Sequence, residues 1–307
     1  MSKKFQEKTI LLLAVSAAAL LCGCSSLSKT QLESVAKFSE TCDSFSAYPS
    51  LIFRELSNIR EQSSVWYASS LTQPENRVSE LQIIADSGGE NEKLIKGVDV
   101  SVNILKSYAR VLKSLAHNNR VDSPGIEIRS AGRAIDTLLT TFNSLNVTKP
   151  ISTGFLSAAA KIVAFGAELN AERVRAEALR ELLPAGDTLV SALCLSLESI
   201  LKGDELKSLI LHEQQMISSN YLSYLRIRGG DIEEDRLFVE LIERGNELSK
   251  LRTATLTSVS SLRRAHNKLT SQIGEGISLP ELLMEIDEFG KEVSKLHKST
   301  MKWYKNR

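Results

Sequence analysis

The segment LHEQQM, residues 211–216, begins like the metal-binding helix of a zinc protease. That chemistry needs two histidines four positions apart on one helical face, with a glutamate between them as general base. Met216 occupies the position four after His212, so the ligand set is incomplete. The other histidines are each expected alone, at a helix end or on a charged face: His117, His266 and His297. The sequence therefore predicts no metal site, although it cannot show which histidines meet in space.

Other catalytic patterns are also missing from the sequence. The serines are numerous, but none lies in the Gly-x-Ser-x-Gly pattern of a nucleophile elbow. The glycine pairs at 88–89 and 229–230 lack the lysine and spacing of a phosphate-binding loop. The carboxylates of residues 233–235 are expected at a helix start, where negative charge complements the helix dipole. We therefore expect a protein that is not an enzyme and that holds no cofactor.

The N-terminal residues have the composition of an export signal. Lys3, Lys4 and Lys8 form a positive head, and the apolar stretch Thr9–Leu21 follows them. This stretch has 13 residues, whereas a membrane-spanning helix needs about 20. Its length suits the apolar core of a secretory signal peptide.

Residues 21–24, Leu-Cys-Gly-Cys, resemble a bacterial lipobox, with a leucine three positions before the modified cysteine and a small residue directly before it. The resemblance covers residues 1–25 only. It implies cleavage after Gly23 and a diacylglyceryl thioether on Cys24, while Cys22 leaves with the signal. Ser25 implies an outer-membrane address facing the periplasm if the cell has two membranes. A plain signal peptide or a buried N-terminal helix is the alternative.

Composition and charge restrict the class of partner. The chain has 38 Lys and Arg against 37 Asp and Glu. Residues 1–23 hold three lysines and one glutamate, so the remaining chain has 35 cations and 36 anions, a net charge of −1. Because no basic excess is present to neutralise phosphates, nucleic acid is not an expected partner. Aromatic residues are only 6%, and the abundance of Leu, Ala, Ser, Glu and Lys favours helices.

Two cysteines remain beyond the N-terminal pair. Cys42 and Cys194 both lie in apolar patterns with helical spacing. In an exported protein they could form a disulfide bond. They could equally be two buried thiols that pack as small apolar side chains. The sequence leaves both alternatives open, because spacing along the chain does not determine the distance between the two Cα atoms.

Apolar residues recur at helical spacing along the whole chain, and no sustained alternation indicates a strand. Thr30 and Glu33 are placed as a capping box that starts the first helix. The Pro184–Gly186 segment should stop a helix, and Asp187 should cap the next one. The expected helices cover these ranges: 30–48, 51–71, a short piece around 78–84, 91–117, 127–146, 152–183, 187–228 with a weak point at 202–204, 232–273 and 280–304.

We therefore expect an all-α fold, an elongated antiparallel helical bundle with long C-terminal helices. Short glycine turns between the last three ranges predict an elongated three-helix hairpin that packs against the earlier helices. Residues 1–23 are assigned as the signal peptide, 24–29 as a short tether and 30–307 as the bundle, with a soft division near 150–186.

Two segments admit a second interpretation. Gly154–Ala167 is the most apolar stretch after the signal and is rich in small residues. It is expected to be a central core helix, and the alternative is a membrane-inserting hairpin. The basic tail KLHKSTMKWYKNR, residues 295–307, is expected to be the last helical turn. Its alternative is contact with an anionic membrane or a partner.

The sequence thus predicts a lipid-anchored cell-envelope protein that acts as a non-enzymatic scaffold, adaptor or partner-binding bundle. Its expected partners are the membrane, through the anchor on Cys24, and a protein of the envelope. Two other functions stay open. One is a bundle that holds an apolar ligand or lipid in a cavity lined by Gly154–Ala167. The other is an immunity or inhibitor protein of the envelope.

Overall fold

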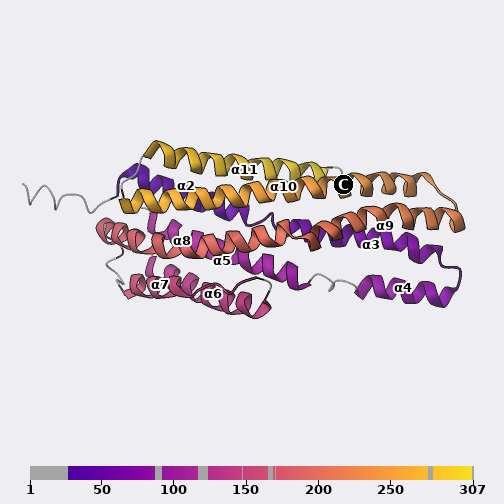
Figure 1. Ribbon diagram of the computed structural model, residues 1–307, viewed down its shortest axis with the longest axis horizontal. Helices are drawn as coiled ribbons and strands as arrows, with labels where there is room; N and C mark the ends of the chain where they lie inside the picture. The colour runs from indigo at the N-terminus through magenta and orange to yellow at the C-terminus, as the bar shows by residue number, and fades with distance from the viewer. Residues whose placement is uncertain are drawn as a thin grey trace, which may run out of the picture.

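The computed structural model describes residues 27–86, 92–116, 124–146, 148–164, 169, 171–275 and 279–305. Within these ranges the regular elements are all helices (Figure 1). Their bounds are α2 Lys29–Phe45, α3 Leu51–Ser70, α4 Pro74–Asp86, α5 Glu92–Ala116, α6 Pro124–Leu145, α7 Gly154–Ala164, α8 Glu172–Lys202, α9 Asp204–Arg228, α10 Ile232–Glu275 and α11 Leu279–Lys305. The predicted all-α fold is confirmed.

The helices run along one long axis (Figure 1). Helices α8 and α9 follow each other with a break at Gly203, α10 returns beside them, and α11 turns back again. The 44 residues of α10 span about 66 Å at 1.5 Å per residue. We call the end where α2, α8 and α11 begin the proximal end, and the end with the α3–α4 and α9–α10 turns the distal end. The predicted three-helix hairpin is confirmed.

The core is organised around a buried seam on α10. The seam repeats at alternating spacings of three and four residues, which keeps one face of a long helix against its neighbours. Its members are all buried: Leu241, Arg244, Leu248, Leu251, Thr255, Ser258, Leu262, Ala265, Leu269 and Gln272. Helices α2, α3, α8, α9 and α11 all pack against α10. A single cluster of buried apolar side chains therefore runs from α2 to α11.

The α9–α10 turn at the distal end depends on glycine. Gly229 has φ 74°, a left-handed conformation that side chains with a Cβ rarely adopt. Beside this turn, Trp66 of α3 packs against Tyr221 of α9 in a tilted arrangement, with ring centroids 4.7 Å apart. Tyr221 stacks on Phe238 of α10 at the same 4.7 Å separation. Aromatic packing thus joins three helices where the predicted glycine turn closes.

Helix α2 starts differently from the prediction. Ser28, not Thr30, is its N-cap, and the capping box is completed by Gln31 instead of Glu33. The Ser28 Oγ accepts from the Gln31 N–H at 3.2 Å, and the Gln31 Oε1 accepts from the Ser28 N–H at 2.8 Å. Ser28 and Gln31 have the same spacing as Thr30 and Glu33 but each lies two residues earlier in the chain, so α2 begins before the predicted position. Leu27 is already buried, at 4% exposed, which shortens the predicted tether of residues 24–29.

The predicted helix stop at Pro184–Gly186 is wrong. Helix α8 continues from Glu172 to Lys202 with Pro184 inside it. The proline is exposed, while Leu182, Leu183 and Leu189 around it are buried. Burial of this apolar face outweighs the backbone hydrogen bond that proline cannot make. Asp187 consequently lies inside α8 and does not cap a helix.

The predicted helix 152–183 is divided. Helix α7 ends at Ala164 and α8 begins at Glu172, and residues 165–168 and 170 lie outside the described chain. Only part of the surface of α7 is buried, through residues such as Phe155 and Ile162. Helix α7 packs against α6 and α8 at the lower edge of Figure 1. The expected central position of Gly154–Ala167 is therefore wrong for the described part.

The segment most compatible with a membrane span by length and composition lies elsewhere, in Glu172–Arg228. Its most apolar 18-residue window has a mean hydropathy of 1.2, and 56% of that window is buried in the protein. Leu193 and Leu197 of α8 show this burial, since neither is exposed. An apolar helix that is buried against other helices has the composition of a core element.

Candidate functional site

A buried chain of hydrogen bonds links α5, α10 and α8. The Tyr108 hydroxyl lies 2.6 Å from His266 Nε2, and His266 Nδ1 lies 2.9 Å from Asp187 Oδ1. His266 is 0% exposed and Tyr108 1%. The Phe38 and Tyr108 rings pack against the imidazole at centroid distances of 5.5 and 5.4 Å. The arrangement of carboxylate, imidazole and hydroxyl is that of an acid–base relay.

Burial controls the protonation states in this chain. Burial lowers the pKa of His266 from its ordinary value, and the Asp187 carboxylate opposes this effect in part. Burial also raises the pKa of Tyr108 well above its ordinary value. A neutral imidazole therefore donates from Nδ1 to Asp187 and accepts the Tyr108 O–H at Nε2.

The relay is enclosed by the described part of the core. A Cβ added to Gly186 would lie 2.2 Å from the Tyr108 Oη, so the hydroxyl is pressed against the backbone of α8. Each polar atom of the imidazole already has a partner, and the Tyr108 ring packs edge-on against Phe155. The geometry indicates a polar connection in the core. The expectation that His266 lies at a helix end or on a charged face is wrong.

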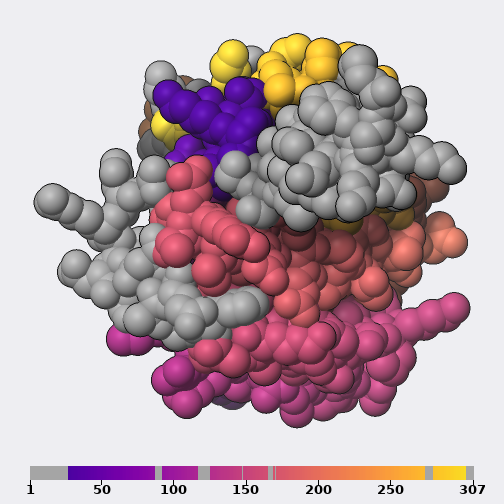
Figure 2. All heavy atoms as spheres, turned by 90° about the vertical axis from the view of Figure 1, so that its left-hand side faces the viewer, coloured from indigo at the N-terminus to yellow at the C-terminus, as the bar shows by residue number. Residues whose placement is uncertain are grey.

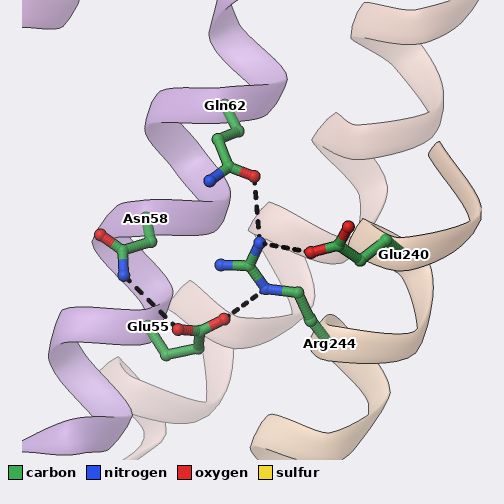
Figure 3. A network of polar contacts seen from close by, with 5 residues as sticks. All are labelled: Glu55, Asn58, Gln62, Glu240 and Arg244. Carbon is green, nitrogen blue, oxygen red and sulfur yellow. Dashed lines mark hydrogen bonds and ion pairs between the residues drawn. The ribbon is translucent and has the colours of Figure 1, made fainter. Parts of the chain in front are cut away.

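A second buried polar network lies between α3 and α10 in the distal half (Figure 3). The Arg244 Nε donates to Glu55 Oε1 at 2.5 Å. Its Nη1 donates to Gln62 Oε1 at 3.0 Å and to Glu240 Oε1 at 3.2 Å. The Glu55 and Arg244 side chains are 10% and 8% exposed. Nη2 of Arg244 has no hydrogen-bond partner in the described part of the chain.

The LHEQQM segment places its two ionisable residues on different sides of α9. His212 is exposed, whereas Glu213 is buried. Glu213 Oε1 accepts from the Arg60 Nε at 2.7 Å. This ion pair links α9 to α3 and turns the glutamate away from His212. His297 of α11, in contrast, contacts the turn between α2 and α3, since its Nδ1 lies 2.9 Å from the Tyr48 hydroxyl.

The acidic residues at the start of α10 do more than complement the helix dipole. Asp231 Oδ1 accepts the N–H groups of Glu233 and Glu234 at 3.0 Å each and so caps the helix. Glu234 also accepts from the Trp66 indole N–H, and Asp235 accepts from the Tyr221 hydroxyl. Burial and the Asp235 hydrogen bond raise the pKa of Tyr221 to about 12. The carboxylates thus hold the distal aromatic cluster.

Both remaining cysteines are buried free thiols. Cys42 is 2% exposed and Cys194 is 0% exposed. Burial raises the pKa of the Cys42 thiol, and the nearby Cys194 raises it further. Burial likewise raises the pKa of Cys194. Protonated, enclosed thiols of this kind pack as small apolar groups. Gly23 and Cys24, the predicted cleavage and lipidation sites, lie outside the described residues.

A pocket of about 340 Å³ lies between α6 and α7. Ile128, Leu156 and Val163 supply apolar side chains, and Ala159 leaves room between the helices. Arg129, Arg133 and Asp136 of α6 also line it. The volume is at the lower end of the range for small-molecule sites. It includes part of the small-residue stretch for which an apolar ligand is predicted, and that function stays a prediction.

A longer groove follows the contact between α2 and α11. These helices run in the same direction, as the pairs Lys37–Asp287 and Tyr48–His297 show. One part of the groove has a volume of about 750 Å³ and the adjoining part about 520 Å³. Small residues line it together with these charged residues: Lys37, Glu40, Asp43, Asp287, Lys291, Lys295 and Lys298.

No protein-family model matches the chain, and neither the curated proteins nor the solved structures contain a significant match.

The sequence patterns did not single out the buried networks, although one signal was present. Arg244 occupies a position of the three-four seam between Leu241 and Leu248, where an apolar residue is the rule. Glu55 likewise lies between Ile52 and Leu56 on the buried face of α3. A charged residue inside an apolar repeat marks a candidate for a buried pair.

The Arg244–Glu55 pair predicts strong coupling between the two helices. Replacing Arg244 with Met should cost about 3–5 kcal/mol, because Glu55 is left charged and buried. The double variant Glu55→Met/Arg244→Met should recover most of this loss. Urea unfolding followed by circular dichroism would measure both. Additive losses in the double variant would contradict the coupling. The exposed pair Glu233–Arg236 is the control, worth about 0–1 kcal/mol.

The buried His266 predicts that stability falls on mild acidification. Its pKa is lowered in the folded state, so below about pH 6.5 the unfolded chain binds more protons than the folded chain. Unfolding free energy should therefore decrease from about pH 6.5 to 5.5, by at most about 1.4 kcal/mol per pH unit. The His266→Gln variant should be less stable but flatter in this window. Parallel pH profiles for the two proteins would show that another group is responsible.

Proposed function

We propose that the protein is a lipid-anchored helical scaffold of the cell envelope that binds a protein partner. The observation that carries the proposal is the position of Leu27. This residue is buried, and α2 begins two residues later at the proximal end (Figure 1). Only two residues separate it from Cys24 in the sequence. A lipid on Cys24 would hold the folded body directly at the membrane surface.

The view onto the proximal end supports this arrangement (Figure 2). The starts of α2, α8 and α11 surround this end face, with α6 and α7 below them. The helices then extend away over about 66 Å along α10, taken at 1.5 Å per residue. An anchored body of this length places its distal half away from the attachment point, where helical faces are available to partner helices.

Helix α4 is the best candidate for the partner contact. Of its 13 residues, Val78, Leu81 and Ile83 are 55%, 37% and 57% exposed. Ile84 is its one buried residue, and α4 packs against α3 at the lower edge of the body in Figure 1. Exposed apolar side chains gathered on one short element are typical of interaction surfaces.

The anchor predicts different outcomes for the two N-terminal cysteines. Cys24→Ala should abolish incorporation of a labelled fatty acid and release the protein from the membrane fraction. Cys22→Ala should leave both unchanged, because this residue is expected to leave with the signal peptide. Metabolic labelling and fractionation of cells would measure the two effects. A Cys24→Ala protein that keeps its lipid label would refute the anchor.

The partner contact predicts a site-specific crosslink. A photocrosslinking amino acid at Ile83 should join the acylated protein in cells to one discrete partner, and the Val78→Asp variant should weaken this crosslink severalfold. Leu195 of α8, which is 54% exposed, is the matched apolar control and should give no such product. Equal crosslinking from both positions, or recovery of monomer alone, would count against α4 as the binding surface.

A further inference from the structure

We propose that the outward face of α11, with the groove between α11 and α2, lies on the surface of an anionic phospholipid membrane. This inference rests on the proposed lipid anchor and specifies how the anchored body is oriented. The partner chemistry is the layer of phosphate headgroups. The surface that meets it is defined by Lys37 of α2 and Lys291, Ser294, Lys295 and Lys298 of α11.

The first argument is the length of chain before the fold. An extended chain covers at most about 3.6 Å per residue, so the Cα of Leu27 lies within about 11 Å of the Cα of Cys24. Leu27 is buried in the body and cannot move away from it. The start of α2 must therefore lie at the headgroups of the membrane that holds Cys24. Helix α11 packs against α2, so it is brought to the same surface.

The second argument is the distribution of charge along α11. Residues 293–307 contain four lysines and one arginine but no acidic residue. Within the described side chains, Lys291, Lys295 and Lys298 are exposed and follow each other at spacings of four and three, which places them on one face. Lys295 pairs with Glu292, whereas Lys291 and Lys298 have no ion pair in the described part of the chain. This face attracts an anionic surface.

The third argument is the shape between the two helices. Ser44, Ala47, Gly290 and Ser294 leave a hollow that adjoins the lysines. A Cβ added to Gly290 would contact nothing within 4 Å, so the hollow is open above this residue. Glu40, Asp43 and Asp287 also line it, but Asp287 is paired with Lys37, Glu40 with Lys113 and Asp43 with Lys106. Lys291 and Lys298, which have no ion pair in the described part of the chain, supply the positive charge.

This orientation agrees with the proposed partner surface. Helix α11 lies along the upper edge of the body and α4 and α6 along the lower edge (Figure 1). The end view shows the same order, with α11 above and the α6–α7 region below (Figure 2). When α11 rests on the membrane, helix α4 lies on the opposite side of the body.

Site-directed spin labels on the acylated full-length protein test the inference. Ser294→Cys places a label on the proposed membrane face, and Thr140→Cys on α6 is the matched control. Both residues are exposed hydroxyls that donate to the carbonyl four positions earlier, of Gly290 and Asp136. In vesicles with about one third phosphatidylglycerol, position 294 should be shielded from an aqueous relaxation agent and position 140 should not.

The lysines should control this shielding. Each lysine near an anionic surface contributes about a fivefold factor, so Lys291→Gln/Lys295→Gln/Lys298→Gln should shift the docked population about 100-fold toward release. Vesicles of phosphatidylcholine alone or high salt should release wild-type α11 as well. An unchanged thermal transition would show that the triple variant is folded.

Three outcomes separate the claims. Equal exposure of positions 294 and 140 on vesicle-bound protein overturns the orientation while the anchor stands. Shielding that survives the triple variant also overturns it. Shielding seen in cells but not in pure vesicles assigns the face to a protein and overturns the lipid proposal. A protein that carries no acyl group and does not stay with the vesicles instead refutes the proposed function.

Discussion

Burial of one continuous seam on α10 is the constraint on which the rest of the fold depends. The helix is long enough to contact both halves of the body, and its seam is covered by five other helices. Leu248, Leu262 and Leu269 are almost completely buried there. A helix of this length without such coverage would expose a long apolar stripe, and shorter helices that follow each other, such as α8 and α9, cover it in succession.

Polar residues in the seam determine how the neighbours align. Thr255 and Ser258 need no partner on another helix for their hydroxyl hydrogens, because these hydroxyls donate to carbonyls four residues earlier in α10. Arg244 of the seam and His266, which adjoins the seam, reach other helices: Arg244 donates to Glu55 of α3 as well as to Glu240 of α10, and His266 contacts Tyr108 of α5 and Asp187 of α8. Arg244 and His266 are 22 positions apart, about 33 Å along the helix. A shift of seven residues would return the apolar residues to equivalent positions but would break both polar connections, so the polar groups specify the register.

The helices could be predicted from the sequence because glycine turns and the spacing of apolar residues are local signals. The lengths of α9–α11 followed from Gly203, the Gly229–Gly230 pair and Pro280. The continuation of α8 through Pro184 could not be predicted from neighbouring residues, because it depends on the burial of α8 against α10 and α5. The His266 network was equally hidden, since its partners lie 79 and 158 residues away in the sequence. Patterns along the chain therefore predicted most helices. The continuous helix at Pro184 and the His266 network depend on contacts between helices, which those patterns do not contain.

The net charge of this protein does not show how charge is distributed over its surface. The chain without residues 1–23 is nearly neutral, yet residues 293–307 contain basic side chains and no acidic ones. Helical register turns this local excess into a line of lysines on one face of α11, and the packing of α11 on α2 brings that line next to the predicted anchor. The predicted lipidation site Cys24 and Lys298 of the last helix, 274 positions apart, would then act on one surface. A lipid restrains the position of the body but leaves its rotation free, because a single attachment point carries no orientation. A second, electrostatic contact on α11 would remove that freedom, and the face opposite to it would be the one presented to a partner.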